Sequence, residues 1–81
     1  FRESVTLYPN PATNQVTLGY VGEAQLQKLT IIDMNGKVIR SMSLENFQSS
    51  QVINTSTLAK GMYFINIQST RDSIVQKLII R

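Results

Sequence analysis

Apolar and polar residues alternate along most of this sequence, and residues typical of turns interrupt the alternation at short intervals. A period of two is typical of β-strands, in which successive side chains point to opposite faces of a sheet. The pattern predicts seven short strands and no convincing helix, with the strands in the ranges 4–8, 15–22, 26–33, 37–44, 51–55, 62–69 and 73–80. Seven strands with a turn roughly every 8–12 residues favour an all-β fold, a seven-stranded immunoglobulin-like β-sandwich. A small barrel is the competing architecture.

Two segments interrupt the alternation most sharply. Pro9 and Pro11 end the first strand, because proline has no N–H to give to a sheet and its ring fixes φ. Asn35 and Gly36 separate the third and fourth strands, and both residues tolerate the positive φ that a type I′ turn requires. The pair therefore predicts a tight type I′ hairpin.

A third motif, Leu58-x-x-Gly61-x-Tyr63, stands at the start of the sixth predicted strand. In sandwiches, a tyrosine at the start of a late strand can bond its hydroxyl back to the nearby backbone. We expect Tyr63 to form such a corner and Gly61 to permit the close approach of the chain.

The seventh predicted strand has two apolar faces. We assign to the core the residues of one parity, Ile74, Leu78 and Ile80. The opposite parity holds Val75, Lys77, Ile79 and Arg81. Only one face of a sandwich sheet looks into the core, so Val75 and Ile79 either pack under a loop or form a small exposed apolar surface flanked by cations. We therefore expect this strand to be either hidden in a sheet or presented to a partner.

The composition removes several classes of function. The 81 residues suffice for one small domain, spanning residues 1–81, and they include no Cys and no His. Thiolate and imidazole metal sites and the usual general bases are therefore absent, so we expect no metal, no cofactor and no enzyme. The net charge of +3 comes from scattered residues rather than a basic run, and no apolar stretch is long enough to span a bilayer. We expect neither nucleic-acid binding nor direct membrane insertion.

Four motifs resemble those of a known family in order and spacing. They are Tyr8-Pro9-Asn10-Pro11, Asp33-x-x-Gly36-Lys37-Val38, Leu58-Ala59-x-Gly61-x-Tyr63-Phe64-Ile65 and Lys77-Leu78-Ile79-Ile80-Arg81. Together they cover essentially the whole chain, which resembles the type A C-terminal sorting domain of the type IX (Por) secretion system of Bacteroidota. The chain has Arg81 where many members have Lys, and the positive charge is kept.

This resemblance implies a C-terminal domain of a larger exported protein, with the fold of a seven-stranded immunoglobulin-like sandwich. The outer-membrane translocon, with its shuttle and sortase components, would recognise the domain and carry the covalently attached upstream passenger from the periplasm to the cell surface or the medium. A sortase-like cysteine peptidase typically then removes the domain. We expect the translocon to read residues 77–81, through their backbone edge as in strand addition or through the cations of Lys77 and Arg81.

The alternative from another class is a non-catalytic binding module for a glycan or a protein, appended to a secreted enzyme. Such modules usually expose aromatic platforms. We place four of the six aromatic residues on strands with core packing, namely Tyr8, Tyr20, Tyr63 and Phe64. Phe1 and Phe47 remain, which are too few for a convincing platform.

Overall fold

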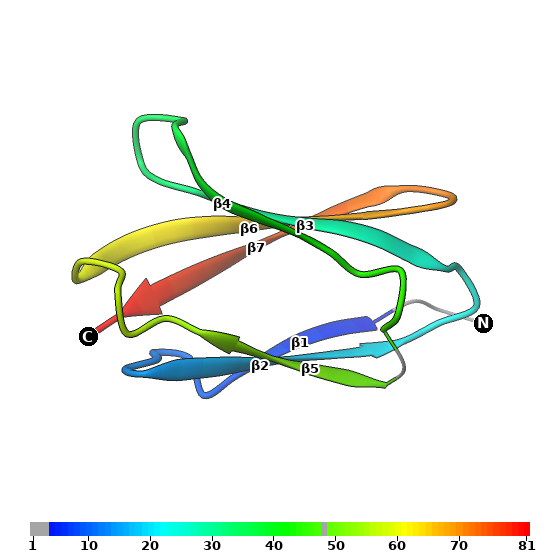
Figure 1. Ribbon diagram of the computed structural model, residues 1–81, viewed down its shortest axis with the longest axis horizontal. Coiled ribbons are helices and arrows are strands. Elements are labelled where there is room, and N and C mark those ends of the chain that lie inside the picture. The colour runs from blue at the N-terminus through cyan, green and yellow to red at the C-terminus, as the bar shows by residue number, and fades with distance from the viewer. Residues whose placement is uncertain (1–3, 48) are drawn as a thin grey trace.

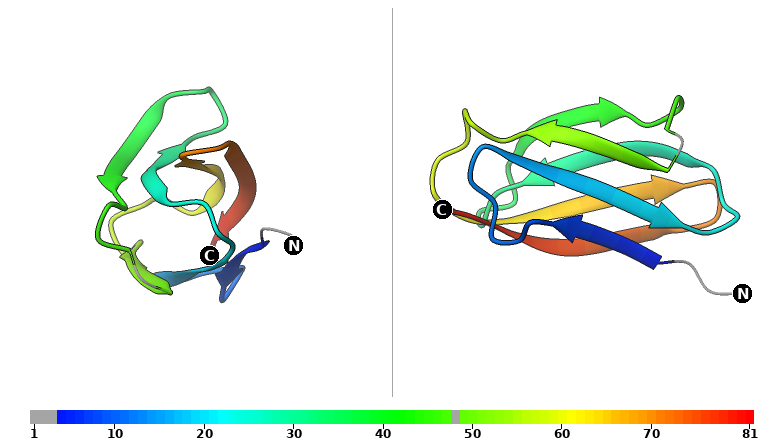
Figure 2. Two further views of the ribbon diagram at one scale, coloured as in Figure 1. Left: turned by 90° about the vertical axis from the view of Figure 1, so that its right-hand side faces the viewer. Right: turned by 90° about the horizontal axis from the view of Figure 1, so that it is seen from below.

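The computed structural model describes residues 4–47 and 49–81, which fold into two antiparallel sheets packed face to face (Figures 1 and 2). The strands are β1 (Ser4–Tyr8), β2 (Gln15–Val21), β3 (Leu26–Ile32), β4 (Val38–Ser43), β5 (Ser50–Asn54), β6 (Gly61–Ser69) and β7 (Ser73–Ile80). One sheet has the order β1-β2-β5 and the other has the order β4-β3-β6-β7. All seven predicted strands are confirmed, with bounds that differ by one residue at most.

The two sheets form a sandwich rather than a closed barrel, and an isolated parallel bridge between Ala12 and Ile80 links them at one edge. The strand order differs from that of constant-type immunoglobulin domains in the place of the fourth strand. There it lies beside the fifth strand, whereas β4 of this chain pairs with β3. The sandwich prediction is confirmed, and the barrel is excluded.

The core lies between the sheets and is built from alternate residues of the strands. Its largest fully buried side chains are Val16, Leu18, Leu29, Ile31, Leu44, Ile53, Thr55, Ile65, Ile67 and Leu78. In β7 the predicted parity is confirmed, because Leu78 and Ile80 are buried and Ile74 is half-buried. The opposite parity points outward, and Val75 is 60% exposed.

The hairpin between β3 and β4 is confirmed, but the type I′ turn is wrong. Gly36 has a φ of +85°, whereas Asn35 does not have the positive φ that a type I′ turn requires. Instead, the Gly36 N–H donates to the carbonyl oxygen of Asp33 at 3.1 Å. The Asp33 N–H donates to the carbonyl oxygen of Lys37 at 3.0 Å. These bonds define a three-residue loop closed by a glycine at positive φ. The Asp33 carboxylate stabilises it by accepting from the N–H groups of Asn35 and Lys37, each at 2.9 Å.

Candidate functional site

The four sequence motifs lie at one end of the sandwich, which we call the motif end (Figures 1 and 2). β6 begins there with Gly61 opposite Ile80 of β7. β3 ends beside Phe64, so the turn that holds Gly36 and Lys37 emerges at the same end. The connection from β1 to β2 crosses this end as well (Figure 2). Segments that are far apart in the sequence therefore share one region of the surface.

The segment from Pro9 to Ala12 covers the outer edge of residues 77–81. Nδ2 of Asn10 donates to the carbonyl oxygen of Lys77 at 2.9 Å, and Oδ1 of Asn10 accepts from the N–H of Ile79 at 3.1 Å. The buried Ala12 continues this pairing. Its N–H donates to the Ile79 carbonyl oxygen, and its own carbonyl oxygen accepts from the N–H of Arg81, both at 2.8 Å. The peptide bonds before Pro9 and Pro11 are both cis.

This cover bears on the expectation that a partner pairs with the backbone edge of residues 77–81 by strand addition. β7 is an edge strand of its sheet, and strand addition needs the unpaired N–H and C=O groups of such an edge. Here Asn10 and Ala12 already occupy four of these groups, the carbonyl oxygens of Lys77 and Ile79 and the N–H groups of Ile79 and Arg81. A partner strand could pair at this position only after the covering segment had left.

The five predicted recognition residues have three different environments. Leu78 and Ile80 are buried in the core. Ile79 is half-buried on the outward face, and Lys77 and Arg81 are exposed. The two cations are therefore the members of the set whose side chains a partner can reach most freely.

The predicted tyrosine corner is confirmed, since the hydroxyl of Tyr63 donates to the carbonyl oxygen of Ala59 at 2.6 Å. Leu58, the first residue of this motif, is partly buried and packs against the core. The role predicted for Gly61 is wrong, because a Cβ built there would meet no atom within 4 Å. Glycine is favoured at this position by its φ of +150°, which residues with a side chain rarely adopt.

The aromatic residues are placed differently from the prediction in three cases. Tyr8 is 51% exposed, and Phe64 lies half-buried on the outward face of its sheet. Phe47 packs against the core and stands edge to face with Tyr20, with ring centroids 6.4 Å apart. Tyr63 is buried as predicted, and Phe1 lies outside the described residues. The described rings therefore form no exposed aromatic platform.

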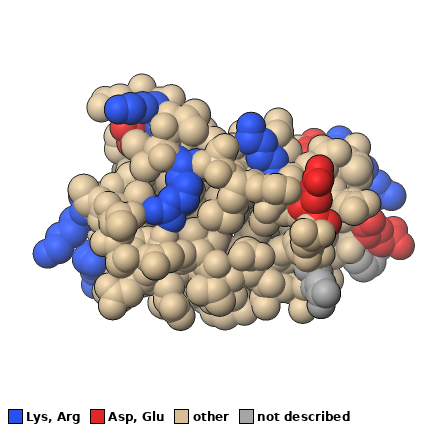
Figure 3. All heavy atoms as spheres, in the orientation of Figure 1, with Lys and Arg blue, Asp and Glu red and all other residues tan. Residues whose placement is uncertain are grey.

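Charged side chains are divided unevenly along the molecule. The motif end carries the exposed cations Lys37, Lys60, Lys77 and Arg81. The acidic residues Glu23, Glu45 and Asp72 lie in connections at the opposite end, and Figure 3 shows acidic side chains mainly over that half. The carboxylate of Asp33 stands in the turn at the motif end, where it accepts two backbone N–H groups. The motif end is therefore the more positive end.

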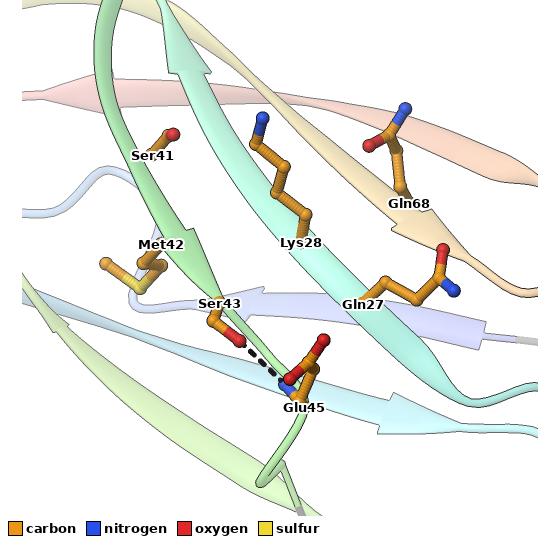
Figure 4. A pocket seen from close by; sticks show the side chains of 7 residues that line it. All are labelled: Gln27, Lys28, Ser41, Met42, Ser43, Glu45 and Gln68. Atoms are coloured by element: carbon orange, nitrogen blue, oxygen red, sulfur yellow. Dashed lines mark hydrogen bonds between the residues drawn. The ribbon is translucent and has the colours of Figure 1, made fainter.

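An open hollow lies away from the motif end, on the side of β3 and β4 (Figure 4). It is lined by Gln27, Lys28, Ser41, Met42, Ser43, Glu45 and Gln68, none of which belongs to the four motifs. Within the described ranges, no three Asp or Glu side chains come together as a possible metal site. The same ranges contain no helix long and apolar enough to cross a membrane.

Comparison with known proteins gave one result. The family model described as "Secretion system C-terminal sorting domain" matches residues 6–81, which is nearly the whole chain and includes all four motifs. No curated protein matches the chain.

Proposed function

Because the chain belongs to the family of secretion system C-terminal sorting domains, it is a C-terminal sorting signal for type IX secretion, and we propose that the outer-membrane translocon reads its motif end. The sorting role entails contact with the type IX machinery and a covalently attached passenger. It also entails passage to the outer membrane, the cell surface or the medium.

The observation that carries this proposal is the meeting of all four motifs at one end of the fold. Leu78 and Ile80 anchor β7 in the core, and the cover of Asn10 and Ala12 holds its edge in place. These contacts hold the backbone from which the exposed side chains of Lys77 and Arg81 project. In our proposal, these cations contact carboxylates of the translocon, and such contacts favour correct encounter and orientation more than raw affinity.

A charge substitution tests this proposal better than a truncation does. Deleting residues 77–81 would remove two buried side chains and unfold the domain, which would block export for an uninformative reason. Residues 1–81 should instead be fused to a periplasmic reporter in a strain with the type IX apparatus. The double variant Lys77→Gln, Arg81→Gln should be retained in the periplasm. The matched variant Lys28→Gln, Arg71→Gln, with two exposed cations outside the motif end, should be exported. Normal export of the Lys77→Gln, Arg81→Gln variant would refute the proposal that the translocon recognises the domain through these cations.

Removal of the domain after transport also belongs to the proposal. β1 runs from Ser4 toward Pro9, so it begins at the end opposite to the motif end (Figure 1). A linker that leads into β1 is therefore remote from the surface that the translocon would contact. A sortase-like cysteine peptidase could cleave there while the motif end is engaged. The mass of the exported passenger would show whether its last residue precedes β1.

The proposal assigns no catalysis to the domain itself, in keeping with the typically non-catalytic character of sorting-signal domains. The alternative of a glycan-binding module is not favoured by any observation, because the described rings form no exposed platform. A glycan array probed with residues 1–81 should show no binding, and specific binding would favour the alternative.

A further inference from the structure

The outward face of the four-stranded sheet is polar at one end and apolar at the other. Directly paired residues lie on the same face, so the strand registers give the rows of side chains across the sheet. The row farthest from the motif end consists of Ser43, Lys28, Gln68 and Ser73. The next row has Ser41, Thr30, Asn66 and Val75. Toward the motif end follows a row of Val38, Ile32, Phe64 and Lys77, and then Met62 with Ile79.

Six side chains make up what we call the outer apolar patch: Ile32, Val38, Met62, Phe64, Val75 and Ile79. Val75 is 60% exposed, Val38 is 57% exposed, and the other four are half-buried. None of the six belongs to the core cluster or to the side chains packed against it. An antiparallel sheet that faces water normally presents polar residues there, as the far half of this same face does. A contiguous exposed apolar patch instead marks an interaction surface.

We propose that the outer apolar patch docks on a protein of the secretion machinery whose contact surface is apolar and carries a carboxylate that pairs with Lys77. This inference rests on the proposed function and extends the contact from two cations to the outward face of β3, β4, β6 and β7. Lys77 stands in one row with Ile32 and Phe64. The four strands of this sheet contain no Asp or Glu, so the charge of Lys77 has no carboxylate partner within them. Covering this cation with an apolar surface is costly unless the partner supplies the opposite charge.

Three other occupants fit the patch less well. Two copies paired about a two-fold axis through the patch would bring Lys77 near its own equivalent, and like charges across an interface oppose association. An anionic membrane surface is typically bound by clusters of about 4–8 cations, whereas of the four exposed cations at the motif end only Lys77 stands in the rows of the patch. The passenger is joined before β1, which begins at the opposite end of a molecule 34 Å long.

Export of the passenger fusion, together with cross-linking, tests the patch. Val75→Ser and Lys77→Gln should each reduce the exported fraction by about tenfold, the factor expected for the loss of one contact worth about 1.4 kcal/mol. Val52→Ser is the matched control, because Val52 is 54% exposed and lies in the other sheet. A photo-reactive residue at position 75 should cross-link to a component of the type IX machinery in cells, and one at position 52 should not. Thermal unfolding of each purified variant shows that the fold is kept.

The outcomes separate this inference from the proposed function. If the wild-type fusion stays in the periplasm, the sorting assignment and the patch both fail. If the wild type is exported and Val75→Ser is exported equally well, the patch is refuted while the sorting assignment stands. Ultracentrifugation that shows a dimer which Val75→Ser dissociates would assign the patch to a second copy. Co-sedimentation with anionic lipid vesicles that Val75→Ser abolishes would assign it to a membrane. Either result would overturn the inference.

Discussion

Substituting Asn10 by Ala tests the cover of the β7 edge most directly. The side chain of Asn10 makes two hydrogen bonds, one to the carbonyl oxygen of Lys77 and one to the N–H of Ile79. Alanine removes both bonds and leaves no cavity in the core, because the Asn10 side chain is exposed. The variant therefore reports on these two bonds and on little else.

The magnitude follows from the number of bonds and from their exposure. A typical intramolecular hydrogen bond contributes about 0.5–1.5 kcal/mol, so two contribute about 1–3 kcal/mol. Water can replace the lost partners at this exposed position, which favours the lower end, about 1 kcal/mol. For a domain of this size, a loss of about 1 kcal/mol lowers the melting temperature by about 4–8 °C. Asn14→Ala is the matched control, since Asn14 is also exposed and lies in the same connection between β1 and β2.

Hydrogen exchange of single amides distinguishes the two bonds. In Asn10→Ala, the Ile79 N–H should exchange at least about fivefold faster, as expected for a loss of about 1 kcal/mol. Asn10→Asp has the same shape and keeps the acceptor, so it should keep the protection of the Ile79 N–H. It loses the donor to the Lys77 carbonyl oxygen, so it should still unfold at a lower temperature. Unchanged exchange at Ile79 in Asn10→Ala would show that the side chain does not cover this edge.

Three further substitutions test the corner and the core by thermal unfolding. Tyr63→Phe removes the corner hydrogen bond and should cost about 1–2 kcal/mol, whereas Tyr8→Phe should cost little because Tyr8 is half exposed. Gly61→Ala should cost about 1–3 kcal/mol through backbone strain alone. Gly19→Ala, which has no positive φ, should cost less, and equal costs would refute the conformational role of Gly61. Leu78→Ala should cost about 2–5 kcal/mol of a total stability of about 4–12 kcal/mol, and a loss below 1 kcal/mol would show that this side chain does not anchor the core.

The sequence predicted the strands well, because alternation over short runs leaves few other structures for this chain. It did not predict which face of β6 is buried. Both parities of that strand are apolar at its start, with Met62 and Phe64 on one and Tyr63 and Ile65 on the other. Pattern alone cannot choose between two apolar faces, and we placed Phe64 in the core. The packing of the two sheets settles the choice, since Tyr63 and Ile65 are buried in the core between them and Phe64 is half-buried on the outward face.

The type of the turn between β3 and β4 was predicted wrongly for a different reason. The pair Asn35-Gly36 is compatible with a two-residue loop and also with a three-residue loop that ends at glycine. What distinguishes them is Asp33, whose carboxylate accepts the N–H groups of Asn35 and Lys37 and thereby stabilises the longer loop. The aspartate was visible in the sequence. Its role was not, because we assigned it to the end of the strand rather than to the turn.

The cover of β7 could not be predicted, because no local pattern connects Asn10 with Lys77 and Ile79. These two residues follow Asn10 in the chain by 67 and 69 positions. Its chemistry explains why two prolines flank this asparagine. An uncovered sheet edge is a template for pairing with other chains, which a secreted domain must avoid. Pro9 and Pro11 have no N–H, so the covering segment cannot extend the sheet further. Asn10 satisfies the edge with its side chain, and Ala12 does so with its backbone. The edge of residues 77–81 is thus closed, while the outward side chains of the same residues remain available to a partner. A signal that must stay unaggregated before it is read needs both properties, and in our proposal it is read on the outward face rather than at the backbone edge.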